Sequence, residues 1–145
     1  IGSVVLWFAY TSDMFFRGMT PAADGLPVVA RHARALGVRV PEDVRLDAES
    51  RILPGCGGLS VAPESMWNLP NHRRPRGMWR GSTGPAADRV FSVSPACLAS
   101  AGLLVRPDPH QPLKHAFVEP HRAVDLSSYE AMLASTRPDW RQDGH

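Results

Sequence analysis

Proline and glycine occur so often in this chain that long, uninterrupted helices are not expected. The 145 residues include 14 prolines and 12 glycines. Proline lacks an amide donor and glycine favours turn conformations, so both residue types tend to end regular elements. Hydrophobic residues make up 43% of the chain and charged residues 21%, a balance typical of a globular protein. The sequence therefore predicts a domain of many short elements joined by ample loops.

Short apolar runs between turn residues predict the strands and helices. We expect two helices, over residues 26–36 and 126–134, the second capped either by Asp125 or by a capping box of Ser127 with Glu130. Single helical turns or short strands are expected within 38–52 and 63–69, and loops over 54–58 and 71–85. The irregular spacing favours an α+β domain with mostly antiparallel strands over a doubly wound parallel sheet. The expected strands cover residues 4–10, 14–18, 59–61, 90–93, 103–105 and 115–119.

The polar run from Arg137 onward predicts a C-terminal tail, so the expected single domain covers residues 1–136 and the tail 137–145. The apolar run 4–10 is too short to span a bilayer, and we expect no contact with membranes. The two cysteines form no Cys-x-x-Cys pair, so no metal site is expected. Two cysteines make no disulfide framework, which favours a reducing, cytoplasmic setting. The net charge of +2 neither demands nor excludes a nucleic-acid partner.

Three separated segments carry candidate functional residues. Arg17 closes an apolar strand, where its guanidinium could extend to solvent or hold a phosphate by two hydrogen bonds. Ser60 follows the glycine-rich loop 54–58, which is either a tight turn or a weak phosphate-binding signal. His115 and Glu119 are four residues apart on one predicted strand, so both side chains project from the same face.

The most basic stretch, residues 72–80, offers a different interpretation. Arginines alternate there with Trp79 and follow His72, a composition that could bind phosphates and stack bases. A solvated loop is the commoner structure for such a run. An RNA-directed toxin or RNA-binding module, using this loop with His72 or His115, therefore stays open as an alternative.

In chain order these segments resemble one family, the ADP-ribosyltransferase-like cytotoxins first known as type VI secretion effectors, with relatives in fungi and other bacteria. The resemblance consists of short pieces spread over most of the chain. The standard Ser-Thr-Ser segment is reduced to Leu59-Ser60-Val61, and the Glu-x-Glu pair is absent. The similar pieces are Phe15-Phe16-Arg17, Gly57-Gly58-Leu59-Ser60-Val61, Val90-Phe91-Ser92-Val93 and residues 115–133.

The resemblance implies an ADP-ribosyltransferase-like fold, with two small β-sheets around a cleft that takes NAD as substrate. It implies that Arg17 contacts the dinucleotide beside Gly58 and that Ser60 supports the nicotinamide ribose. It places the catalytic role on His115 or Glu119, and Trp67 or Trp79 could cover the nicotinamide ring.

The function expected from this resemblance is an NAD-dependent ADP-ribosyltransferase or NAD glycohydrolase. Such a toxin would act in the cytoplasm of a producer or target cell on an unidentified acceptor. It would require a cognate immunity or antitoxin protein. A non-catalytic interaction domain on the same fold is a further alternative, because fold does not fix function.

Overall fold

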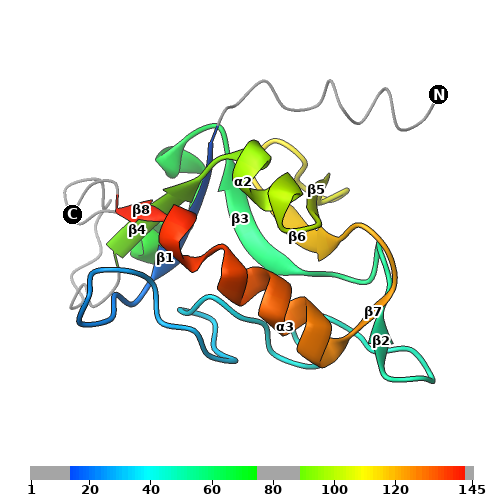
Figure 1. The fold of residues 1–145 in the computed structure, drawn as a ribbon. Coiled ribbons are helices and arrows are strands. Elements are labelled where there is room, and N and C mark those ends of the chain that lie inside the picture. The colour runs from blue at the N-terminus through cyan, green and yellow to red at the C-terminus, as the bar shows by residue number, and fades with distance from the viewer. Residues whose placement is uncertain (1–13, 75–88, 143–145) are drawn as a thin grey trace.

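The computed structural model describes residues 14–74 and 89–142 of the chain. These described residues form eight strands, two α-helices and three 3-10 turns, and a long segment without a named element joins the first strand to the second (Figure 1). The strands are β1 (Phe15–Met19), β2 (Arg51–Ile52), β3 (Leu59–Pro63), β4 (Arg89–Val93), β5 (Leu103–Pro107), β6 (Ala116–Pro120), β7 (Val124–Asp125) and β8 (Arg141–Gln142). The helical elements are η1 (Met66–Asn68), η2 (Asn71–Arg73), α2 (Pro95–Ser100), α3 (Leu126–Ser135) and η4 (Arg137–Asp139).

Six strands form one sheet in the order β5-β6-β3-β1-β4-β8, and β2 and β7 form a separate two-stranded sheet. Every neighbouring pair is antiparallel. This confirms the predicted α+β class with mostly antiparallel strands. The strands expected at 14–18, 59–61, 90–93, 103–105 and 115–119 are all present within one or two residues of their predicted bounds, whereas the strand expected at 4–10 lies outside the described residues.

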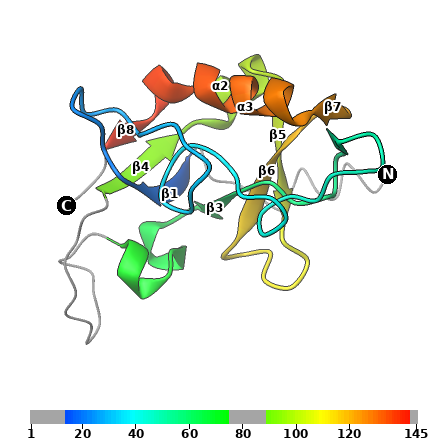
Figure 2. The same ribbon diagram turned by 90° about the horizontal axis from the view of Figure 1, so that it is seen from below.

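The hydrophobic core lies between the sheet and the two α-helices. Figure 2 shows α2 and α3 together on one side of the strands, with the 3-10 turns η1 and η2 and the β5–β6 loop on the other. Ala116 and Val118 of β6 are fully buried and pack in the same cluster as Tyr129 and Leu133 of α3. Asp125 caps α3 by accepting a hydrogen bond from the Ser128 amide, which confirms the predicted cap.

The large sheet opens between β1 and β3. These strands are paired only at Phe15–Pro63 and Phe16–Ala62. Beyond that point β1 continues along β4 as far as Met19, while residues 59–61 of β3 pair with β6. The two halves of the sheet therefore separate next to Arg17 and Ser60, on the side away from the helices.

The helix predicted over residues 26–36 is wrong, because this segment forms turns and bends. Its backbone hydrogen bonds do not follow the i-to-i−4 pattern of a helix, and some of them join residues outside the segment. The Thr20 amide donates to the Arg34 carbonyl, and the Leu36 amide donates to the Val28 carbonyl. The carbonyls of Ala33 and Ala35 accept hydrogen bonds from the Arg17 side chain. Tertiary contacts have replaced the i-to-i−4 ladder that the apolar spacing favoured.

Helix α2 is an element that the sequence patterns did not predict. Its start carries a recognisable signal, because the Ser94 side chain accepts a hydrogen bond from the Cys97 amide and Pro95 occupies the first turn. The helix spans six residues, of which Leu98 is buried. So short a segment shows no apolar periodicity.

Among the described residues, no helix has the length and apolar character needed to cross a membrane.

The fold continues past the boundary expected at residue 136. Trp140 is 1% exposed in the core, and its indole N–H donates to the Thr136 hydroxyl. Arg141 and Gln142 then form β8 against β4. Because the surrounding residues are polar and β8 has two residues, sequence periodicity could not reveal this last strand. The residues through Gln142 thus belong to the folded unit.

The chain offers two described tryptophans in opposite environments, which permits a matched test of this extension. We predict that Trp140→Ala lowers the free energy of unfolding by about 3–5 kcal/mol, because it empties a buried site. Trp67 is 47% exposed, so Trp67→Ala should lower the free energy of unfolding by less than about 1 kcal/mol. Urea denaturation measures both; equal effects would contradict the assignment of Trp140 to the core.

Candidate functional site

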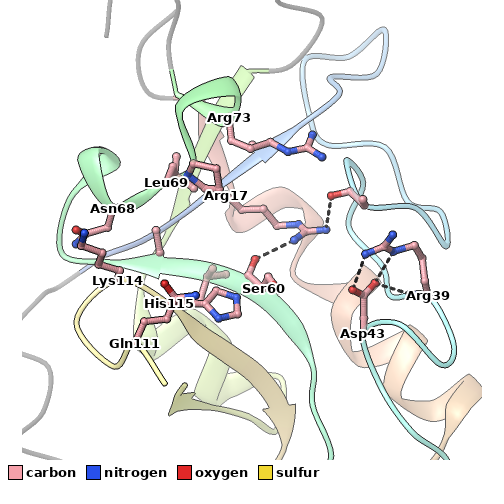
Figure 3. Close-up of a pocket in the computed structure, with 15 residues that line it drawn as sticks. Arg17, Arg39, Asp43, Ser60, Asn68, Leu69, Arg73, Gln111, Lys114 and His115 are labelled. Atoms are coloured by element: carbon pink, nitrogen blue, oxygen red, sulfur yellow. Dashed lines mark hydrogen bonds and ion pairs between the residues drawn. The ribbon is translucent and has the colours of Figure 1, made fainter. Parts of the chain in front are cut away.

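A pocket of about 310 Å³ lies where the sheet opens, on the face opposite the helices (Figure 3). This volume is near the lower end for small-molecule sites. Its walls come from β1, β3, the turns near η1 and η2, the segment before β2 and the β5–β6 loop. The polar lining residues are Arg17, Arg39, Asp43, Ser60, Asn68, Arg73, Gln111, Lys114 and His115.

Arg17 holds the separated strands and the adjacent loop together. The side chain is nearly buried, at 7% exposed. Its Nη1 donates to the Ser60 carbonyl at 2.8 Å, and its Nη2 donates to the carbonyls of Ala33 and Ala35 at 3.0 and 2.8 Å. Its Nε also donates to Ala35, at 3.2 Å. Four of the five N–H groups of a guanidinium are thus used by the protein's own backbone.

The charge of Arg17 persists despite its burial. Burial lowers its pKa to about 10, the Asp43 carboxylate opposes this shift, and the nearby Arg73 and Arg39 add to it. At neutral pH the group is therefore a cation that feels two neighbouring cations. Arg73 approaches closely because residue 18 is glycine: a Cβ there would lie 3.1 Å from the Arg73 carbonyl oxygen and 3.3 Å from its side chain.

Arg39 and Asp43 form an ion pair on the loop side of the pocket. The Asp43 carboxylate accepts from the Arg39 amide at 2.7 Å and from its Nε and Nη2 at 3.1 and 3.0 Å. Burial alone would raise the pKa of Asp43, but the hydrogen bonds from Arg39 outweigh it and hold the pKa below its usual range. The spacing of four residues lets this pair form within one tight turn.

The lining carries an excess of positive charge. It contains the cations Arg17, Arg39, Arg73 and Lys114, against Asp43 as the one carboxylate among the described pocket residues. No hydrogen bond or ion pair joins the Lys114 ammonium to another described residue. Cations gathered around a partly enclosed space, with too few carboxylates to balance them, favour an anionic ligand.

His115 enters this pocket with a fixed orientation. Its Nδ1 lies 2.8 Å from Oδ2 of Asp108, and its ring meets the Phe117 ring edge-on at a centroid distance of 4.8 Å. The hydrogen bond from His115 is the main reason that the pKa of Asp108 lies below its usual range. His115 therefore faces the pocket while an ionised carboxylate holds its opposite edge.

The structure brings together three of the predicted site residues, since Arg17, Ser60 and His115 all line this pocket. Glu119 is not among its lining residues. Its buried carboxylate, 3% exposed, accepts from the Gly55 amide at 2.6 Å and from Arg106 at 2.8 Å. Four residues of extended chain separate it from His115 by about 13 Å, so the two side chains lie too far apart to act on the same bond of a ligand.

The other predicted contacts fall elsewhere. Trp67 does not line the pocket; its ring packs against the Arg74 guanidinium at 5.0 Å. Gly58 is also outside the lining, and a Cβ there would lie 2.3 Å from the Val118 carbonyl oxygen, so this glycine permits β3 and β6 to approach. Trp79 and most of the basic stretch 72–80 lie outside the described residues.

Sequence patterns missed several residues that shape the site. Arg39 and Asp43 have the four-residue spacing of an ion pair, a signal that could have drawn attention to them. Lys114 is the only lysine in the chain and precedes a predicted strand. Asp108 lies seven residues from His115, and only the return of the β5–β6 hairpin reveals that the two meet.

No group of three or more metal-ligating side chains occurs within residues 14–74 and 89–142. Comparisons with family models, with curated proteins and with solved structures return no match for this chain.

Arg17 should matter more for stability than its place in a pocket suggests. We predict that Arg17→Ala lowers the free energy of unfolding by roughly 3 kcal/mol or more, because it removes donors from the buried carbonyl of Ala35 and the half-buried carbonyl of Ser60. Arg17→Lys should restore little of this loss, since one ammonium cannot reproduce the planar fork. Urea denaturation measures both variants; an Arg17→Ala protein of unchanged stability would contradict the structural role.

Proposed function

We propose that this pocket binds NAD and that the protein is an ADP-ribosyltransferase-like toxin that cleaves the bond between nicotinamide and ribose. The observation that carries the proposal is convergence: Arg17, Ser60 and His115 come from distant parts of the chain and line one cation-rich pocket. NAD has a diphosphate that such cations would bind and ribose hydroxyls that the polar side chains would contact.

The pocket offers different groups to the parts of this substrate. Arg73 and Lys114 bring positive charge for the diphosphate. Arg17 contributes its positive charge from a distance while it keeps its hydrogen bonds to the carbonyls of Ser60 and Ala35. Asn68 and Gln111 can donate to and accept from ribose hydroxyls. In this assignment Arg17 is chiefly the support of the phosphate site, and the side chains at the open rim make the direct contacts.

Cleavage of the nicotinamide bond places positive charge on the ribose. A carboxylate close to that centre would stabilise it. Because Glu119 lies away from the pocket, we assign this role to Asp43, the one carboxylate among the described pocket residues, which Arg39 holds by hydrogen bonds. Ser60 then supports the nicotinamide ribose, and His115 contacts the group that attacks it.

Cleavage of NAD by this protein would harm the cell that contains it. We therefore also propose an immunity protein that covers the pocket.

The single lysine provides a direct test of ligand binding. Reductive methylation with ¹³C-formaldehyde retains the charge of Lys114 and gives one dimethyl-lysine NMR signal from the chain's only lysine side chain. We predict that NAD and ADP-ribose shift this signal with a common saturation curve and that nicotinamide alone leaves it in place. The same protein should release nicotinamide from NAD. A signal unmoved by either dinucleotide would contradict the proposal.

A charge-matched pair of variants separates pocket binding from general electrostatics. Lys114 and Arg122 lie just before and just after β6, but only Lys114 lines the pocket. Lys114→Gln should weaken NAD binding about tenfold, the loss of roughly 1.4 kcal/mol, and Arg122→Gln less than twofold. If an RNA oligonucleotide instead binds with a steep salt dependence and NAD does not, the RNA-directed alternative replaces this proposal.

A further inference from the structure

The β5–β6 hairpin loop holds an Asp–His pair at the edge of the pocket. The Asp108 amide donates to the His115 carbonyl at 3.0 Å, and the His115 amide donates to the Gln111 carbonyl at 3.0 Å. These bonds close the loop directly below the pairing of β5 with β6. The backbone on both sides of the pair is thus tied into the sheet, which limits how far either side chain can shift.

Both oxygens of the Asp108 carboxylate are used. Oδ1 accepts from the His110 amide at 2.9 Å, and Oδ2 contacts Nδ1 of His115 at 2.8 Å. The side chain is 11% exposed. These hydrogen bonds hold the pKa of Asp108 below its usual range, with the bond from His115 as the largest cause. An ionised carboxylate can only accept, so Nδ1 must carry the proton in this contact.

The remaining ring nitrogen has a defined state and direction. In a neutral imidazole protonated at Nδ1, Nε2 carries a lone pair. His115 lines the pocket and Asp108 does not, so the ring edge away from Asp108 faces the ligand space. Nε2 makes no hydrogen bond to any of the described residues. Ser60 lies on the same wall, because it pairs with Phe117, two residues from His115.

We propose that Asp108 is a positioning residue, which locks His115 in the Nδ1-protonated tautomer so that Nε2 serves as a general base for an oxygen nucleophile. This inference rests on the proposed function. The attacking O–H group, from water or an acceptor hydroxyl, forms the new bond to the anomeric carbon of the ribose and gives its proton to Nε2. The bond to nicotinamide breaks, and neutral nicotinamide leaves with the electron pair.

The proton transfers in this step explain which catalytic groups the site needs. Nicotinamide needs no proton to leave, so a base is required and a general acid is not. The Asp108 carboxylate stabilises the imidazolium that forms, as a buried carboxylate does for a catalytic histidine. A cationic acceptor such as an arginine side chain would meet the positive lining of the pocket. The preferred acceptor class is therefore a neutral hydroxyl or water.

The tautomer can be measured without any enzymatic activity. Long-range ¹H–¹⁵N correlation spectra of the ¹⁵N-labelled protein distinguish Nδ1-protonated from Nε2-protonated imidazoles, and His115→Gln identifies the signal. We expect His115 in its neutral form to be protonated at Nδ1. In Asp108→Asn, Oδ1 can still accept from His110, whereas the amide NH₂ donates to Nδ1, so the ring should change to the Nε2-protonated tautomer.

His121 provides an internal control in the same spectra. Its Nδ1 lies 2.8 Å from the Gly102 carbonyl oxygen, which can only accept. Its signal should report Nδ1 protonation in the wild type and remain unchanged in Asp108→Asn. Nicotinamide release should fall about 100-fold or more in kcat in this variant, with KM for NAD altered less than threefold, since the lining residues are intact.

Three results would overturn the inference: an Nε2-protonated His115 in the wild type, an unchanged tautomer in Asp108→Asn, or a kcat within threefold of the wild type. The first does not depend on the Asp108→Asn protein, so it decides the matter even if that variant does not fold. A wild-type protein with the expected tautomer that binds NAD but releases no nicotinamide would reject both the base role and the proposed cleavage. The role of Asp108 in holding His115 in the Nδ1-protonated tautomer would remain supported.

Discussion

The hydrogen bonds of Arg17 are the interaction on which the rest of the structure depends. At the point where β1 and β3 stop pairing, an antiparallel sheet would normally leave backbone carbonyls without donors. The Arg17 guanidinium supplies them, to Ser60 on one side and to Ala33 and Ala35 on the other. One side chain thus lets the sheet open and fixes the loop that becomes a wall of the pocket, at the cost of burying a cation.

That buried cation also determines the chemistry of the opening. Burial is the main cause that lowers the pKa of Arg17; the Asp43 carboxylate opposes this shift, and Arg73 and Arg39 lie close enough to add to it. The remaining positive potential is available to a ligand, so the support of the pocket and its attraction for anions have one origin. Opposite this wall the β5–β6 hairpin presents His115, held by Asp108, over the same space. Binding and proton transfer are then supplied by two different walls.

Local patterns in the sequence predicted what local physics controls. The strands at β1, β3 and β6 have strong apolar runs, and α3 has a clear cap, so all four were found close to their true bounds. The segment 26–36 has helical spacing, but its carbonyls at Ala33 and Ala35 accept hydrogen bonds from Arg17. A pattern read within the segment cannot predict a partner so far away in the sequence. The same limit applies to the site: residue types indicated Arg17, Ser60 and His115, whereas the contact of Asp108 with His115 arises from the hairpin. Glu119 has the residue type expected of a catalytic group, but its partners Gly55 and Arg106 turn its carboxylate to another part of the fold.

The most direct test of this account is a crystal structure of the protein with bound ADP-ribose. The account predicts that the diphosphate lies between Arg73 and Lys114, that Arg17 still donates to the carbonyls of Ser60 and Ala35, and that Nε2 of His115 faces the ribose. A diphosphate that draws Arg17 away from these carbonyls, or a ligand bound outside the opening between β1 and β3, would contradict it.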